Sequence, residues 1–406
     1  MATEAGARAA RVAAVARRAW LAALVLLCVA WLPAQAAPRI GVATMQPGEI
    51  FFERFGHNAI VVDAPAAGGA LSYNFGFFDP SEPGFHARFV RGEMRYRLAV
   101  LPFEDDLAYY ASVGRGVSVQ WLDLEPAEAG TLAARLAENA LPGNAAYDYD
   151  YFRDNCSTRV RDALDEALGG LLGAHMHGRS RGNTYRSEAV RLARPDPLMA
   201  LGFDIGLGPA ADRPNSLWAD AFVPMRLAAT LRDIRRPDGR PLVAAEEDLL
   251  PHRIAPEPEP RRVAWWPWLL AGLALAALAW SGRRRPRAVA AAAVVAWGVS
   301  AVAAGLMVFI WLGTEHVFGW ANHNLLLLNP LCLLLLPGAF RIARGGGAGP
   351  VFRGLLALFA ACLVLAPFLQ WLPAWPQRNA HWIALLVPLN AALAAVLWRA
   401  EARPKS

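Results

Sequence analysis

Five apolar runs occupy the last third of the chain, and they constrain its fold more than any other feature. They cover residues 263–281, 288–312, 323–340, 352–372 and 381–398. Each run is close to the ~20 apolar residues with which an α-helix crosses a bilayer. Of the 34 acidic residues in the chain, only Glu315 and Glu401 lie beyond Arg262. We therefore expect a water-exposed front domain followed by a bundle of five transmembrane helices, residues 263–399.

Basic residues between these runs predict the orientation of the bundle. Ten Arg and Lys residues lie on one side of the predicted bundle: in the loop at 283–287, in and beside the loop at 341–353, and in the tail from residue 399. The loops on the other side, 313–322 and 373–380, contain one basic residue between them, Arg378. Because basic residues gather on the cytoplasmic side of membrane proteins, the front domain should lie outside and the tail, residues 400–406, inside.

The N-terminal segment, residues 1–36, has the order of a secretory signal peptide. Four arginines precede an apolar run over 19–32, which Pro33-Ala34-Gln35-Ala36 follows. This run is short for a membrane span, and the small residues fit a cleavage site after Ala36. An uncleaved N-terminal anchor is the alternative, and both interpretations export the next segment. We expect a multi-pass protein of the inner (cytoplasmic) membrane whose front domain lies in the periplasm or extracytoplasmic space.

Residues 37–253 are long enough for one domain with a sizeable core. β-favouring runs at 59–62, 71–75, 94–101 and 117–124 are separated by Gly, Pro and Asp clusters, and 126–139 has helical spacing. We therefore expect an α+β domain. A Pro-rich stretch, 254–262, is predicted to be an extended linker to the first span.

Cys156 is the only cysteine of the exported domain, because Cys28 belongs to the signal peptide and Cys332 and Cys362 lie within spans. It has no partner there for an intrachain disulfide. Apolar residues after it recur at helical spacing, so Cys156 should lie in the first turn of a helix, where backbone N–H groups stabilise a thiolate. We predict a nucleophile; a buried small side chain is the alternative.

A cysteine nucleophile needs a base, and His57 is the best candidate because it lies where a glycine-flanked turn enters a strand. A third polar group should orient the imidazole, and Asn74 on the next strand is our candidate, with Asp79 as the alternative. His175 and His177 form a His-x-His pair without a neighbouring Cys or carboxylate. We expect no metal site and no cofactor.

Together these residues resemble a known family. A His on a strand, a polar residue on the following strand and an Asn-Cys pair at a helix start resemble the circularly permuted papain-like arrangement of NlpC/P60-related thiol enzymes. The chain is more closely similar to the DUF4105 family, also called the Lnb N-terminal periplasmic domain family. The motifs that carry this resemblance lie at 55–58, 73–76, 89–92, 149–159 and 216–220, and the Asn-Cys-Ser-Thr-Arg block at 155–159 is the most specific. The segments 314–316, 322–326 and 329–330 are also similar to that family's C-terminal region.

The resemblance implies an enzyme that moves an acyl chain within a diacylated lipoprotein onto the α-amino group of its lipid-bearing cysteine. Cys156 would then attack an acyl ester, with His57 as base and later as acid. The backbone N–H of Cys156 would help to hold the oxyanion. The expected partners are a membrane lipid or lipoprotein and the bilayer itself.

Substrate contacts are expected from both parts of the chain, although solvation of a surface or membrane boundary is the alternative for each residue. The candidates are Asn155, Tyr149, Tyr151, Arg159, Arg115, Glu315, His316 and His323. Fusion of five spans to the domain favours a lipid substrate over an exported peptidase or amidase that acts on cell-wall peptides. A non-catalytic membrane-anchored module is the third hypothesis. No basic stripe is interleaved with aromatics, so we expect no nucleic-acid partner.

Overall fold

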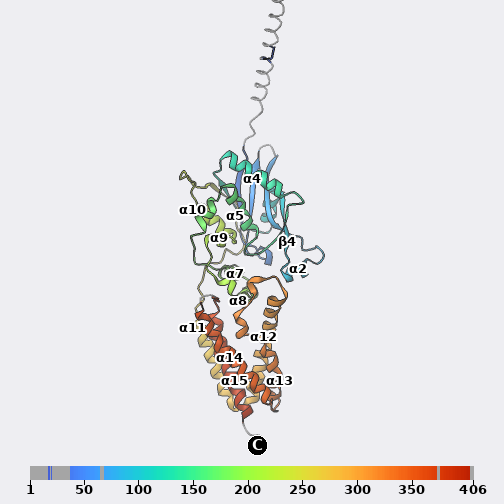
Figure 1. Ribbon diagram of the computed structural model, residues 1–406, viewed down its shortest axis with the longest axis vertical. Helices are drawn as coiled ribbons and strands as arrows, with labels where there is room; N and C mark the ends of the chain where they lie inside the picture. Colours follow the sequence, from blue (N-terminus) through green and yellow to red (C-terminus); the bar gives the residue numbers. More distant parts are fainter. Residues whose placement is uncertain (1–16, 19, 21–36, 65–67, 373–374, 403–406) are drawn as a thin grey trace, which may run out of the picture.

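The computed structural model describes residues 17, 18, 20, 37–64, 68–372 and 375–402. A sheet domain lies at one end and a bundle of helices at the other, with α7 (Tyr185–Ala193) and α8 (Pro197–Gly206) between them (Figure 1). The predicted signal peptide lies outside the described residues except at three positions, so its cleavage stays a prediction.

One antiparallel sheet forms the centre of the front domain, with the strand order β6-β4-β3-β2-β1-β5-β7. The strands are β1 (Arg39–Met45), β2 (His57–Ala64), β3 (Gly69–Phe77), β4 (Arg95–Pro102), β5 (Val117–Leu122), β6 (Ala146–Asp148) and β7 (Val243–Leu250). The four predicted strands correspond to β2, β3, β4 and β5. The sequence did not lead us to expect β1, β6 and β7.

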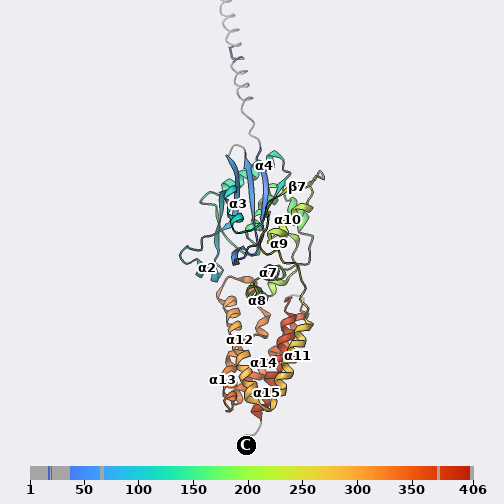
Figure 2. The ribbon, with the colours of Figure 1, turned by 180° about the vertical axis from the view of Figure 1, so that it is seen from behind.

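Helices cover both faces of this sheet. Ile60 and Val62 of β2 pack against α4 (Pro126–Asn139) and α5 (Cys156–Ala167). Figure 1 shows both helices beside the sheet. Ala59 and Val61 point to the other face, where α3 (Phe103–Ser112) lies (Figure 2). Successive side chains of a strand point to opposite faces, and β2 is covered on both, so its central residues, 59–62, are all apolar. The predicted helix at 126–139 is α4.

The bundle consists of α11 (Trp266–Ser281), α12 (Pro286–Gly313), α13 (Leu331–Ala343), α14 (Pro350–Phe368) and α15 (Ala380–Ala402). Four helical segments among the described residues are long and apolar enough to cross a membrane: Pro286–Gly313, Val317–Ala343, Pro350–Trp371 and Ala380–Ala402. The first expected span, 263–281, forms α11, whose 16 residues fall short of the ~20 that a full span needs. The bundle therefore supports four spans, and the fifth stays a prediction.

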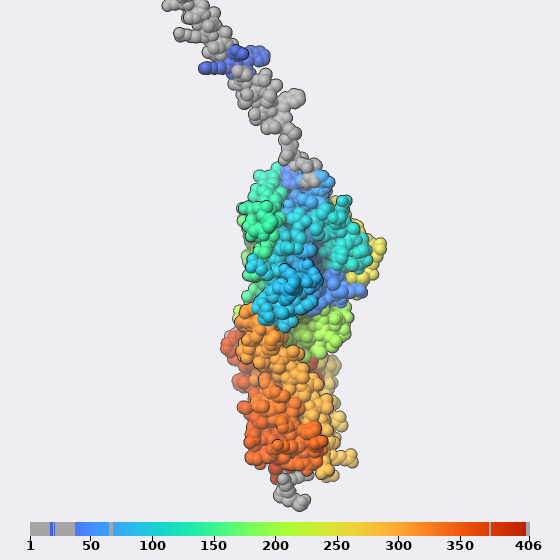
Figure 3. Space-filling model, turned by 90° about the vertical axis from the view of Figure 1, so that its right-hand side faces the viewer, coloured from blue at the N-terminus to red at the C-terminus, as the bar shows by residue number. Residues whose placement is uncertain are grey.

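The front domain rests directly on the outer end of the bundle. In Figure 3, the connection between α12 and α13 (orange) meets the front domain (cyan and light green). Backbone hydrogen bonds join the two parts there: the Gly208 N–H donates to the Phe318 carbonyl at 2.6 Å, and the Glu315 N–H to the Arg91 carbonyl at 2.7 Å. Contacts of the folded chain, and not only the linker, therefore hold the domain over the bundle.

Candidate active site

Cys156 is the first residue of α5, and Asn155 caps that helix. The Asn155 side chain accepts a hydrogen bond from the Thr158 N–H, and the Thr158 hydroxyl accepts one from the Asn155 N–H, which completes a capping box. The Asn155 amide nitrogen also donates to the carbonyls of Tyr151 and Phe222, at 3.1 and 2.9 Å. Asn155 thus fixes the helix start that presents the thiol. Its predicted contact with substrate stays a prediction.

His57, the first residue of β2, lies within hydrogen-bonding reach of the Cys156 thiol. The neighbouring residues hold this pair in place: the Ser157 hydroxyl contacts the Asn58 side-chain oxygen at 2.8 Å and the Ala221 carbonyl at 2.6 Å. Ser157 and Asn58 are fully buried, whereas Cys156 is 8% exposed. The contact between α5 and β2 therefore brings the predicted nucleophile and base together near the surface.

The two groups shift each other's protonation. Burial alone would raise the pKa of the Cys156 thiol, but the imidazolium of His57, its hydrogen bond and the backbone N–H groups of Asn58 and Ser157 lower it. Burial alone would lower the pKa of His57, but the thiolate and the hydrogen bonds with Cys156 and Asn74 raise it. This pattern favours a thiolate–imidazolium pair, which is the reactive form of a cysteine nucleophile.

Asn74 of β3 orients the imidazole. Its Oδ1 lies 3.0 Å from His57 Nε2, while its Nδ2 donates to Asp106 Oδ2 at 2.9 Å and to Ser72 Oγ at 3.1 Å. The Ser72 hydroxyl donates to the same Asp106 oxygen at 2.5 Å. A carboxylate only accepts, so Asp106 directs the amide nitrogen of Asn74 toward itself and the amide oxygen toward His57. His57 Nε2 then carries the proton, and Nδ1 is the nitrogen available to the thiol.

Asp106 is a site residue that was not predicted from the sequence. It lies in the first turn of α3 after Glu104 and Asp105, where acidic residues are ordinary because of the helix dipole. A signal was nevertheless present: Phe103, Asp106 and Tyr110 are spaced to share one helical face, and all three are buried. The alternative third group, Asp79, is instead exposed and hydrogen-bonds Ser81.

Gly76 lies close to Cys156 and to two tyrosines. Its φ is +86°, and a Cβ placed there would lie 3.1 Å from Tyr149 Cε2 and 3.7 Å from both Cys156 Cβ and Tyr147 Oη. Tyr147 Oη is buried and has no hydrogen-bond partner among the described residues. Burial, and then the Cys156 thiolate, hold the pKa of Tyr149 well above its ordinary value. Two protonated phenols therefore lie close to Cys156.

The two predicted arginine contacts are already paired. Arg159 makes an ion pair with Asp154 and lies over the Tyr147 ring at 4.1 Å. Arg115 is 3% exposed; its Nε donates to the Gln46 carbonyl at 2.8 Å, and it faces Glu53 at 3.4 Å. Both side chains brace the surroundings of the site, and the recognition of a substrate anion by either one stays a prediction.

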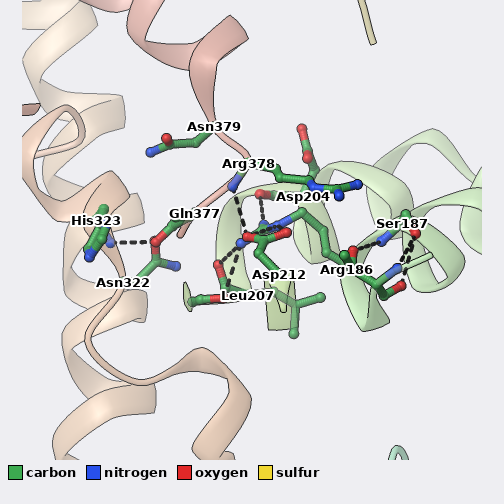
Figure 4. Close-up of polar contacts among 12 residues, drawn as sticks. Arg186, Ser187, Asp204, Leu207, Asp212, Asn322, His323, Gln377, Arg378 and Asn379 are labelled. Atoms are coloured by element: carbon green, nitrogen blue, oxygen red, sulfur yellow. Dashed lines mark hydrogen bonds and ion pairs between the residues drawn. The ribbon is translucent and has the colours of Figure 1, made fainter. Parts of the chain in front are cut away.

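Residues of the bundle reach the rim of the site. His316 Nε2 lies 3.1 Å from the Phe89 carbonyl, and its ring lies 5.9 Å from that of Tyr151. Tyr151 is thus the predicted substrate contact at which the two parts of the chain meet. The backbone of Glu315 packs against Gly92. His323 lies elsewhere in the interface, where its N–H donates to Gln377 Oε1 at 2.8 Å (Figure 4).

The remaining histidines considered above do not form a shared site. His175 contacts Arg179 at 2.7 Å, and His177 stacks on Trp218 at 4.6 Å. Within the described part of the chain, no group of three His, Cys, Asp or Glu side chains is arranged to hold a metal ion.

Comparison with known families matches both parts of the chain. Residues 34–187 match the family described as Lnb N-terminal periplasmic domain, and residues 258–397 match the Lnb transmembrane domain. No curated protein and no solved structure matches the chain, so the papain-like class stays a prediction. The first match contains His57, Asn74 and Cys156. With both domains in one chain, the protein belongs to the Lnb family and is a membrane protein with a periplasmic domain.

Proposed function

We propose that this protein is a thiol acyltransferase that acts on a membrane lipid or lipoprotein at the outer face of the inner membrane. The observation that carries the proposal is the series Cys156, His57, Asn74 and Asp106, in which each side chain orients or activates the one before it. The bundle reaches this site through His316, which lies beside Tyr151. The series supports an activated nucleophile, and its place above the bundle supports a lipid substrate.

In the first half-reaction, the Cys156 thiolate attacks the carbonyl carbon of an acyl ester. As the tetrahedral intermediate collapses, the ester C–O bond breaks and the His57 imidazolium gives its proton to the leaving alcohol. The products are an acyl-thioester on Cys156 and a lyso-lipid. In the second half-reaction, an amine attacks the thioester, neutral His57 takes the amine proton, and the thiolate leaves. The thiolate–imidazolium pair is regenerated and the acyl chain ends in an amide.

The intermediate's negative oxygen needs donors. The backbone N–H of Cys156 lies in the first turn of α5, where N–H groups have no partner within the helix. Tyr147 Oη lies beside Gly76, near the thiol, and has no partner among the residues described. We assign both to the oxyanion, because fixed donors in a partly dry site stabilise developing charge without reorganisation.

A lipid substrate explains the direct contact between the two domains better than a cell-wall peptide does. A wall peptidase needs only one anchor, whereas here the connection between α12 and α13 packs against Tyr151, five positions before the nucleophile. An ester carbonyl sits at the boundary between headgroups and acyl chains, and a site held at the outer end of the bundle can reach that depth.

The test compares cells that carry the wild-type protein, Cys156→Ala or the matched control Cys362→Ala, whose cysteine lies in α14. Mass spectrometry of lipoprotein N-termini should show N-acylation and lyso-lipid with the wild type and with Cys362→Ala, and loss of both with Cys156→Ala. Unchanged lipoproteins together with altered peptidoglycan fragments in Cys156→Ala cells would point to the peptidase instead. No change in either pool would leave a non-catalytic module.

A further inference from the structure

α8 is an apolar helix that the protein does not bury. Its sequence is Pro-Leu-Met-Ala-Leu-Gly-Phe-Asp-Ile-Gly, and none of its ten residues is buried. Leu198 is 79% exposed and Leu201 is 41% exposed. A water-exposed helix normally turns a polar face outward, so an apolar outer face indicates contact with something other than water. Neither matched family domain includes this helix.

Hydrogen bonds tie α8 to the outer end of the bundle. Asp204 Oδ2 lies 2.7 Å from His381 Nε2 and accepts from Trp382 Nε1 at 2.9 Å. The Asn322 amide nitrogen donates to the carbonyls of Ile205 and Gly206, at 2.7 and 3.0 Å. Figure 4 shows where Asp204 and Asn322 lie in this interface. The C-terminal half of α8 therefore lies level with the first turn of α15.

That level is the water–lipid boundary. The ring of Trp382 in the first turn of α15 lies 5.1 Å from that of Trp268 in the first turn of α11. Trp265 and Trp266, which shortly precede Trp268 in sequence, are exposed. Tryptophans gather at the headgroup level of membrane proteins. In Figures 1 and 2, α8 lies at the outer ends of α11 and α12.

The front domain also holds α8 rigidly. Arg186 of α7 donates to the Asp204 carbonyl at 2.5 Å and to the Leu207 carbonyl at 2.6 Å, and it pairs with Asp212 at 2.9 Å. On the side of the thiol site, the Phe203 ring lies 5.7 Å from that of Phe55, two residues before His57. α8 therefore has a fixed depth relative both to the bundle and to the strand that carries His57.

We infer that α8 is an interfacial helix that lies in the outer leaflet, with Leu198 and Leu201 among phospholipid acyl chains. The bundle presents the same kind of surface, since Val299 and Leu306 of α12 are apolar and 66% and 61% exposed. The partner is thus the bilayer that already surrounds the spans. Such a helix sets the depth of the domain by burying its apolar face at the boundary between headgroups and acyl chains.

The test places one spin label at a time on the full chain in phospholipid nanodiscs, in a background without native cysteines. Leu198→Cys and Leu201→Cys are the test positions. Val299→Cys marks the lipid-exposed surface, and Leu141→Cys, 54% exposed just after α4, marks water. Collision of the label with oxygen, which dissolves in lipid, is compared with collision with a water-soluble nickel chelate.

We expect both α8 labels to collide preferentially with oxygen, as at Val299 and opposite to Leu141. A water-like pattern at both α8 positions would overturn the inference. Protection from both colliders would also overturn it, because a protein surface, such as a second copy of this chain, would then cover the helix. The reference labels report whether the background variant is folded and inserted. The result does not depend on acyl transfer, because Cys156 is absent from every variant.

Discussion

Asp106 fixes the orientation of Asn74: the carboxylate accepts the Asn74 amide nitrogen at 2.9 Å, so the amide oxygen faces His57 Nε2 at 3.0 Å. Without this contact, the amide could rotate and offer a donor to the imidazole. The contact therefore selects the tautomer of His57 that can exchange a proton with Cys156. Asp106 does not contact the imidazole itself and acts through Asn74, so it is a positioning residue of the site.

Replacing Asp106 should impair the site and weaken the fold. Asp106→Ala removes the acceptor that the Asn74 amide nitrogen and the Ser72 hydroxyl share, at a cost of about 1–3 kcal/mol. The amide nitrogen keeps Ser72 Oγ and the hydroxyl keeps the Leu101 carbonyl, but neither contact fixes which amide atom faces His57. Alkylation of Cys156 by iodoacetamide near neutral pH should slow, because His57 is no longer held. The exposed neighbour Asp105 gives the matched control, Asp105→Ala. Equal alkylation rates in the two variants would show that Asp106 has no role in positioning.

The pH profile of alkylation should report the pairing of Cys156 with His57. In the wild type, the thiol should titrate below its ordinary pKa of ~8.5, because the pair lowers the pKa of Cys156. In His57→Ala, burial is left as the main influence and the midpoint should move above the ordinary value. The exposed His86 serves as control, and His86→Ala should keep the wild-type midpoint.

The same pair predicts the sign of a stability change with pH. His57 has a raised pKa in the folded state, so its contribution is present below its ordinary value and is lost as pH rises through the folded value. Cys156 has a lowered pKa, so its contribution is present above the ordinary thiol value and is lost as pH falls through the folded value. We expect the difference in the free energy of unfolding between wild type and Cys156→Ala, measured by thermal unfolding from about pH 5 to about pH 10, to change with pH. A constant difference would argue against the ion pair.

A side chain at Gly76 should block the site. Gly76→Ala places a methyl group 3.1 Å from Tyr149 in a left-handed conformation. The strain should cost about 1–2 kcal/mol, and the lost space should lower the acyl-transfer rate further than the stability loss explains. Gly178→Ala is the control, because nothing lies within 4 Å of its added Cβ. Full acyl transfer by Gly76→Ala would show that the substrate carbonyl does not use this space.

The buried Arg186–Asp212 pair should hold the interface between the two parts (Figure 4). Arg186→Ala leaves a buried carboxylate without its partner, which typically costs about 3–5 kcal/mol. We expect faster proteolysis between the domains in detergent, with cleavage near α8. The exposed Arg213 provides the control, Arg213→Ala. Identical digestion patterns would mean that the pair does not secure the junction.

The sequence predicted those parts of the molecule that local patterns encode. β2 through β5 and α4 were found because apolar spacing and turn residues mark them, and the motif around Cys156 indicated the helix start that Asn155 caps. β7 escaped because it is an edge strand with three consecutive acidic residues, so it has no apolar alternation. β6 has only three residues.

Features that arise from packing could not be read in this way. Asp106 acts through a contact between α3 and β3, and its acidic neighbours hid it among ordinary helix-start residues. The pairing of Arg159 with Asp154 and the stacking of His316 near Tyr151 depend on how distant segments meet. The first apolar run predicts a full span, whereas the helix that it forms has Pro267 in its first turn and only 16 residues, so this span stays a prediction.

The most direct test of the proposed function is the intact mass of the purified protein after brief incubation with a synthetic diacylated lipopeptide. The wild type should gain the mass of one acyl chain on Cys156, in a form that hydroxylamine removes, while the lipopeptide becomes an N-acylated lyso-form. Cys156→Ala should gain no mass and leave the lipopeptide unchanged. Formation of the lyso-form by Cys156→Ala at the wild-type rate would contradict the account.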